Sequence, residues 1–282
     1  MSTITIRNVW KEYGDLVVLE DINLEIAPRA FVALVGPSGC GKTTFLKMLL
    51  SEELPTRGVI ELDGAPIPRE PSVERGVVFQ RYSVFPHLTV LGNVLLGRDL
   101  QAGGVRGALF GRVFGAQRVA AEKEARELLT AVGLAGAEAK YPAQLSGGMQ
   151  QRLALAQALI ARPKVLLLDE PFGALDPGIR TDIHVLMRKL WHERALTVVM
   201  VTHDLSEAFK LGTRVVAFER RRNEPTDGGR YGAIIGRDIQ IWPTRVAGVQ
   251  QRSDQISASG RDDPLPQSEQ RRDDPALNGA AG

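Results

Sequence analysis

Residues 36–44 read Gly-Pro-Ser-Gly-Cys-Gly-Lys-Thr-Thr, with two glycines five positions apart followed by Lys and Thr. The apolar run 31–35 before this stretch is typical of a buried parallel strand, and apolar residues at helical spacing follow it between 45 and 50. In such a strand–loop–helix unit, glycines allow a tight turn, so that successive backbone N–H groups and the positive end of the helix face one phosphate. The pattern therefore predicts a phosphate loop that binds a nucleoside triphosphate. We expect the whole stretch to line the phosphate site: Gly36, Pro37, Ser38, Gly39, Cys40, Gly41, Lys42, Thr43 and Thr44.

Four polar side chains have a clear chemical use beside such a loop. Lys42 can reach the β- and γ-phosphates, and the Thr43 hydroxyl can ligate Mg²⁺. Residues 165–170, Val-Leu-Leu-Leu-Asp-Glu, form a second apolar strand that ends in two carboxylates. Asp169 can hold the hydration shell of Mg²⁺, and Glu170 is placed to orient or deprotonate a water that attacks the γ-phosphate.

Residues 145–152, Leu-Ser-Gly-Gly-Met-Gln-Gln-Arg, lie between these two sites. Ser146 is a good N-cap residue, and the apolar spacing from Leu153 to Ile160 predicts a helix after it. A Ser-Gly-Gly helix start can bind a second anion. An ordinary capped helix explains the same residues, and without the phosphate loop it would be the preferred interpretation.

Together these motifs resemble the ATP-binding-cassette (ABC) ATPases over about residues 3–243. Residues 145–152 resemble the signature motif of that family almost letter for letter, residues 36–44 its phosphate loop and residues 165–170 its Walker B strand. Four further matches occur in the same order as in the family: Tyr13 with the aromatic residue that stacks on adenine, Gln80 with the Q-loop glutamine, Asp176 with the D-loop, and His203 with the switch histidine.

The resemblance implies roles for these residues. Glu170, His203 and Gln80 would be catalytic, and Thr43, Gln80 and Asp169 would hold Mg²⁺. Tyr13 and the phosphate loop of one copy would bind ATP. In a head-to-tail dimer, a second copy of the chain would bind the same ATP through Ser146, Gly147, Gly148 and Asp176.

The expected fold is α/β, a phosphate-loop NTPase core of the RecA-like type with an antiparallel β-subdomain and a helical signature subdomain at about 86–157. Alternating apolar residues in 3–26 and 59–64 predict the antiparallel strands, and Asp63-Gly64 predicts a hairpin turn. We expect residues 1–250 to form the nucleotide-binding domain. Residues 251–282 are rich in charge and proline and poor in large aliphatic residues, which predicts a disordered polar tail.

Composition narrows the function classes. The net charge of +2 does not favour a nucleic-acid partner, and the single cysteine, Cys40, cannot form an internal disulfide. Cys40 is expected to be a small filler, or, if exposed, a thiol sensitive to alkylation. We see no signal peptide and no run of 18 apolar residues. The resemblance to the ABC ATPases implies that the partners are integral membrane permease subunits and a periplasmic or extracellular solute-binding protein, with this chain peripheral on the cytoplasmic face of the inner membrane.

Three functions remain open for an ATPase of this family. We favour an importer ATPase, and the alternatives are a DNA-maintenance ATPase and a translation factor. Within importers, residues 172–177 and 202–208 resemble the nitrate/sulfonate/taurine group, including its urea-carboxylase-associated branch. Residues 103–118 instead resemble the insertion of branched-chain amino-acid importer ATPases. The apolar residues of that stretch are expected to dock a permease or to pack within the subdomain: Leu109, Phe110, Val113 and Phe114.

Overall fold

The computed structural model describes residues 2–79, 84–99, 116–220 and 231–241, which all belong to one compact unit, Met1–Trp242. Gln80, the apolar residues expected at 109–114 and the tail 251–282 lie outside these ranges.

The described strands form one mixed sheet in the order β5-β4-β1-β2-β10-β9-β3-β8-β7-β6. The bounds of the strands are β1 Ile4–Tyr13, β2 Leu16–Ile26, β3 Phe31–Val35, β4 Arg57–Leu62, β5 Ala65–Pro66, β6 Arg75–Val78, β7 Val165–Asp169, β8 Thr197–Val201, β9 Arg214–Arg220 and β10 Ala233–Gln240. The consecutive strands β9, β3, β8, β7 and β6 are parallel to one another, and β5, β4, β1 and β2 pair antiparallel with one another. Between these two groups, β10 pairs parallel with β2 and antiparallel with β9. The sheet confirms the predicted α/β class and the turn at Asp63-Gly64, where β4 meets β5.

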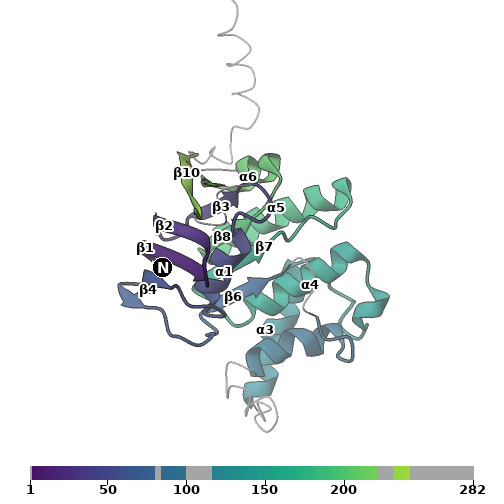
Figure 1. The fold of residues 1–282 in the computed structure, drawn as a ribbon. Coiled ribbons are helices and arrows are strands. Elements are labelled where there is room, and N and C mark those ends of the chain that lie inside the picture. Colours follow the sequence, from purple (N-terminus) through teal and green to yellow (C-terminus); the bar gives the residue numbers. More distant parts are fainter. Residues whose placement is uncertain (1, 80–83, 100–115, 221–230, 242–282) are drawn as a thin grey trace, which may run out of the picture. The chain divides into compact units, whose positions relative to one another are not determined.

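The helices are α1 Lys42–Leu50, a helix at 90–99, α3 Ala116–Ala131, a 3₁₀ turn at Pro142–Gln144, α4 Gly147–Leu159, α5 Pro177–Arg194 and α6 Leu205–Leu211. In Figure 1 the antiparallel strands β1, β2 and β4 gather on one side of the picture, and α3 and α4 on the other. None of the helices within the described ranges combines the length and the apolar character that crossing a bilayer requires.

Strand β3 is buried on both faces because its five residues are all apolar. Phe31, Ala33 and Val35 belong to the core that includes the apolar sides of α4, α5 and α6, whereas Val32 and Leu34 belong to the core that includes α1. Aromatic contacts occur in both cores: Phe31 meets Trp191 edge-on at 6.0 Å in the first, and the rings of Phe45 and Phe218 lie 5.5 Å apart in the second. The phosphate loop therefore extends from a strand held in place on both faces and along both edges.

The predicted helix after Ser146 is present as α4, and its apolar side is buried at Leu153, Ala156, Leu159 and Ile160 as expected. It packs against α3, α5 and β6. Asn93, which is fully buried on the helix 90–99, binds the turn before that helix: its amide oxygen accepts a hydrogen bond from the Phe85 N–H, and its Nδ2 donates to the carbonyls of Phe85, Leu88 and Thr89.

Candidate functional site

The phosphate loop has the backbone geometry that the glycines of its sequence predict. Gly36 has φ 147°, and a Cβ added to it would lie 2.4 Å from the carbonyl oxygen of Phe218 on β9. Gly41 has φ 87°, and a Cβ there would lie 2.7 Å from a methyl group of Leu19 on β2. At Gly36 both the backbone conformation and the neighbouring carbonyl exclude a side chain, and at Gly41 the positive φ disfavours one.

The side chain of Lys42 lies inside this loop and links two of its carbonyl groups. Its side-chain Nζ donates to the carbonyl oxygens of Gly36 at 2.8 Å and Pro37 at 2.9 Å, and the residue is only 6% exposed. Cys40 is buried beside Lys42, with Sγ 3.6 Å from Nζ. The thiol is therefore a packed filler, and the alternative of an exposed, alkylation-sensitive cysteine is wrong.

Thr43 and Asp169 face each other across the first turn of α1 and the end of β7. The Thr43 hydroxyl donates to Asp169 Oδ1 at 3.5 Å. Burial, and next the charge of Glu170, raise the pKa of Asp169, while the Thr43 hydrogen bond and the ammonium groups of Lys42 and Lys47 act in the opposite direction. A partly buried carboxylate that is short of positive charge, next to a hydroxyl, fits a divalent cation with oxygen ligands. In the described ranges there is no group of three or more His, Cys, Asp or Glu residues that could hold a metal alone, so phosphate or water oxygens would have to complete this site.

Glu170 and His203 come together because β7 and β8 are parallel neighbours whose carboxyl ends lie at the same edge of the sheet. The Glu170 backbone takes φ 45° and its N–H donates to the Val201 carbonyl at 3.0 Å. Its carboxylate Oε2 lies 3.3 Å from His203 Nδ1. A left-handed conformation at a residue that is neither glycine nor asparagine is uncommon, and here it turns the carboxylate toward the histidine.

Tyr13 stands at the end of β1, 46% exposed. Its hydroxyl donates to the Glu53 carboxylate, and Lys11 Nζ lies 4.7 Å from the centre of its ring. Partial burial and the hydrogen bond to Glu53 raise the pKa of Tyr13 to about 12, against a smaller opposite effect of the Thr44 hydroxyl. No sequence pattern predicts these contacts of Lys11 and Glu53 with the tyrosine, because they depend on how the end of β1 meets the segment after α1.

Ser146, Gly147 and Gly148 form the start of α4. The Ser146 hydroxyl accepts a hydrogen bond from the Met149 N–H at 3.4 Å, so the predicted N-cap is present. Gly148 lies tight against α5: a Cβ there would come within 2.4 Å of a methyl group of Ile179. Asp176 occupies the N-cap position of α5, and its carbonyl accepts from the Arg180 N–H at 2.9 Å.

Two further residues near these motifs were missed. Arg220 ends β9 and donates through Nη2 to the Gly39 carbonyl of the phosphate loop at 3.3 Å. Glu207, for which the sequence predicts no individual role, is buried and accepts a hydrogen bond from the hydroxyl of Thr202, the residue before His203. The contact of Arg220 follows from the pairing of β9 with β3, which local sequence patterns do not specify.

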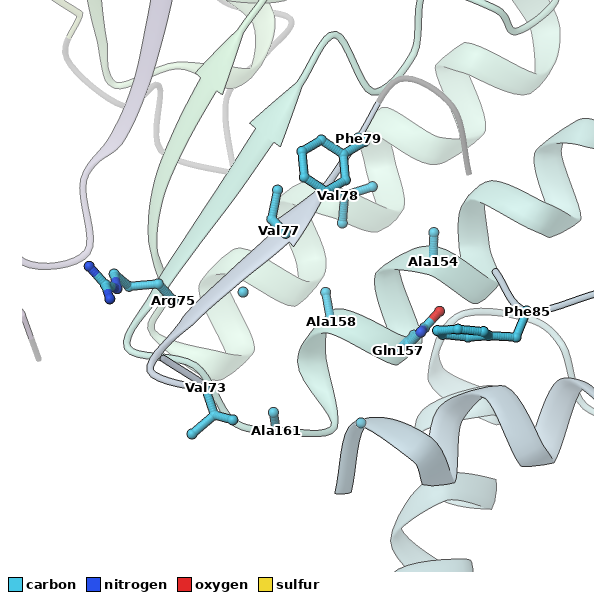
Figure 2. Close-up of a pocket in the computed structure, with 12 residues that line it drawn as sticks. Val73, Arg75, Val77, Val78, Phe79, Phe85, Ala154, Gln157, Ala158 and Ala161 are labelled. Carbon is cyan, nitrogen blue, oxygen red and sulfur yellow. The ribbon is translucent and has the colours of Figure 1, made fainter. Parts of the chain in front are cut away.

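A cavity of about 300 Å³ lies between β6 and α4, on the strand that leads to Gln80 (Figure 2). Val77, Val78 and Phe79 line one side of it and Ala154 and Ala158 the other, with Phe85 at its rim. The lining is predominantly apolar.

Comparisons with known proteins agree with this geometry. A profile of the family described as ABC transporter matches residues 19–173. The sulfate/thiosulfate import ATP-binding protein CysA of Gloeobacter violaceus is 43% identical over 224 residues, which are 79% of this chain and 61% of that protein. The Fe(3+) ions import ATP-binding protein FbpC of Rhizobium etli is 39% identical over 275 residues, 93% of this chain and 74% of that protein. The chain thus spans about three fifths of the length of the first of these relatives.

Solved structures show the same fold. A bacterial ABC transporter cassette described as dimeric superposes with a TM-score of 0.66 and 32% identity, over 84% of this chain and 98% of that one. An ATP-binding cassette in its ADP conformation superposes with a TM-score of 0.71 at 20% identity, over 85% of this chain and 91% of that one. The predicted cassette fold is therefore confirmed.

Proposed function

The chain belongs to the ABC transporter family, and we propose that it is the ATP-hydrolysing subunit of a solute importer. One observation carries the proposal: a phosphate loop containing a buried lysine lies at the same sheet edge as a Thr43–Asp169 pair and a Glu170–His203 pair. A nucleotide-binding loop alone would need neither pair. Hydrolysis needs a metal site and a group that acts on water. The Thr43–Asp169 pair is proposed to supply the first, and the Glu170–His203 pair the second.

Lys42 is the proposed ligand of the β- and γ-phosphates. Its ammonium group donates to two carbonyls of its own loop, at 2.8 and 2.9 Å, so the positive charge lies inside the loop. Phosphate oxygens are stronger acceptors for an ammonium group than neutral carbonyls, so we expect Lys42 to exchange these partners on binding. Tyr13, with Lys11 on one face of its ring, leaves the other face for the adenine.

Thr43 and Asp169 are the residues that would hold Mg²⁺, with Gln80 as a further proposed ligand. When bound, the ion would neutralise charge that develops on the phosphates. The raised pKa of Asp169 supports this role, because a carboxylate that lacks a cation gains most from one.

Glu170 is the proposed general base. His203 is proposed to hold the Glu170 carboxylate and the γ-phosphate in position for in-line attack by water. The 3.3 Å contact between the two side chains supports this division, because the histidine can fix the carboxylate by donating from Nδ1. Such a base contributes roughly 10²–10⁴-fold to a rate. Gln80 is proposed to position the same water and metal.

We propose that two copies bind head to tail, with Ser146, Gly147 and Gly148 of one copy capping the γ-phosphate on the other and Asp176 at the junction. The exposed helix start at Ser146 and the dimeric structure of a relative at 32% identity support this arrangement. ATP that contacts both copies only in the closed state would favour closure, and loss of the γ-phosphate would release it.

The partners follow from the names of the relatives, which are import proteins. We propose integral membrane permease subunits, a periplasmic or extracellular solute-binding protein acting through them, and a peripheral position on the cytoplasmic face of the inner membrane. An apolar helix of the permease is the proposed occupant of the cavity between β6 and α4, because that cavity borders both the strand leading to Gln80 and the signature helix. The import names also favour a transporter over a DNA-maintenance or translation ATPase.

The solute is small, and the named relatives handle sulfate, thiosulfate or Fe(3+). These names support sulfate, thiosulfate or Fe(3+) better than the organic substrates, sulfonates, taurine or branched-chain amino acids, of the groups that the sequence resembles.

The test is phosphate release by the purified chain with Mg-ATP, with Lys42→Ala as the inactive control. We expect hydrolysis that requires Mg²⁺ and rises more than linearly with protein concentration, because two copies form the site. Tight ATP binding without any phosphate release, at every protein concentration, would refute the proposed activity.

A further inference from the structure

A buried polar cluster lies directly under His203, and none of the proposed functional roles uses it. Its centre is Glu207 on α6, which is 4% exposed. The Thr202 hydroxyl donates to Glu207 Oε2 at 2.8 Å. Arg180 Nε and His184 Nε2, both on α5, lie 3.7 and 3.4 Å from Oε1 of the same carboxylate. Burying a carboxylate is costly unless it is paired, so this position is not explained by packing alone.

The cluster encloses the segment that carries His203. Thr202 precedes the histidine and Asp204 follows it; the Thr202 hydroxyl also accepts from the Asp204 N–H at 3.0 Å. Asp204 caps α6 by accepting from the N–H groups of Ser206 and Glu207. Both neighbours of His203 are therefore fixed to the helix that contains Glu207, while the histidine side chain itself is 62% exposed.

Arg180 joins the same cluster to the segment before α5. Its Nη1 lies 3.6 Å from Asp204 Oδ2, and its Nη2 donates to the carbonyl of Leu175 at 3.2 Å. Leu175 immediately precedes Asp176, the residue that starts α5. One guanidinium group thus touches both the segment of His203 and the segment of Asp176.

The contacts of Oε1 are close but not aligned. Although Arg180 Nε and His184 Nε2 lie within ion-pair distance, both atoms are buried and neither makes a hydrogen bond of good geometry. The guanidinium and the imidazole thus share one carboxylate oxygen, and neither forms a well-aligned hydrogen bond to it.

We propose that Glu207 and Arg180 are positioning residues, which hold His203 toward Glu170 and link its position to the Asp176 segment. Neither is a catalytic residue, since neither touches the reacting groups. The consequence for hydrolysis rests on the proposed function, whereas the placement of His203 does not. Because misplacement of a catalytic group by about 1 Å can cost on the order of 100-fold, loss of the Glu207 charge should lower kcat substantially.

The experiment compares Glu207→Gln with Glu193→Gln, which removes an exposed carboxylate on α5 whose nearest cation, Lys189, is 4.0 Å away. Glutamine keeps the size of the side chain and an acceptor for Thr202. We expect Glu207→Gln to lower kcat roughly 10- to 100-fold with KM for ATP unchanged, and Glu193→Gln to do neither. In a His203→Ala background, measured by single turnover, Glu207→Gln should lower the rate by less than about twofold, since the group through which it acts is gone.

A second measurement does not depend on hydrolysis. The chain has four histidines, so the imidazole Cε1–H resonances of the full-length protein can be assigned one by one. We expect Glu207→Gln to shift or broaden the His203 resonance as well as that of its direct neighbour His184, and Glu193→Gln to leave both in place. An unmoved His203 resonance, or a rate effect that is fully retained in the His203→Ala background, would overturn the proposal. If the wild-type chain hydrolyses no ATP, the proposed function fails and the resonances still decide the placement.

Discussion

Replacing Glu170 by Gln isolates the charge of the proposed base from its shape. A general base contributes about 10²–10⁴-fold, so the barrier should rise by about 2.7–5.4 kcal/mol at 1.36 kcal/mol per tenfold change in rate. The structure gives no reason for a folding defect to contribute. Glutamine keeps an oxygen for the 3.3 Å contact with His203, and the backbone bond from Glu170 N–H to Val201 is untouched.

The same substitution should also lower the pKa of Asp169. Because the charge of Glu170 is one cause of the raised pKa of Asp169, its removal should lower that pKa and leave the melting temperature in the absence of Mg²⁺ unchanged or higher. A variant that is inactive and at least as stable as wild type is therefore the expected result.

The assay is phosphate release at saturating Mg-ATP, together with size-exclusion chromatography. Glu170→Gln should bind ATP, hold it unsplit and elute as a dimer in a larger fraction than wild type, whereas Lys42→Ala should lose nucleotide affinity and elute as a monomer. Hydrolysis at the wild-type rate would show that the base is misassigned, and His203 would then be the first residue to examine.

Three further outcomes are expected. Gly36→Ala should abolish nucleotide binding, measured by a fluorescent ATP analogue, because its methyl group would lie 2.4 Å from the Phe218 carbonyl; an alanine variant with full affinity would contradict the loop geometry. Asp169→Asn should raise the melting temperature without Mg²⁺ at neutral pH, because ionising a carboxylate with a raised pKa costs stability there. This gain in stability should be full above the pKa of Asp169 in the folded protein and should vanish as the pH falls toward the ordinary value of 3.8. A variant less stable than wild type at pH 7 would count against this reasoning. Tyr13→Ala should weaken ATP binding by about 1–3 kcal/mol while Tyr13→Phe, which keeps the ring, should stay close to wild type in calorimetry; equal losses would place the effect in the hydroxyl and Glu53 instead.

The sequence predicted the parts of the fold that depend on neighbours along the chain. The apolar runs 31–35 and 165–169 became β3 and β7, and Ser146 caps the helix predicted after it. These features are local: burial on both faces requires a continuous apolar run, and an N-cap requires a short polar side chain at one position.

Other features depended on which strands are neighbours. The contact between Glu170 and His203 arises because β8 pairs with β7, and Arg220 reaches the phosphate loop because β9 pairs with β3. Glu53 and Glu207 contact Tyr13 and Thr202 only once the chain is folded. Their residue types alone therefore could not distinguish them from ordinary surface acids. The role of Gln80 stays a prediction.

The position of β3 in the sheet affects how the chain is made. This strand carries the phosphate loop, yet its two neighbours, β8 and β9, come from the end of the described core, at Thr197–Val201 and Arg214–Arg220. At roughly 5–20 residues per second, a ribosome would release β3 on the order of ten seconds before either neighbour exists. During that interval an entirely apolar strand has both edges unpaired, a state that favours aggregation or chaperone binding. ATP can assist folding only by binding a formed loop, so the nucleotide can stabilise this protein only after nearly the whole core has been synthesised.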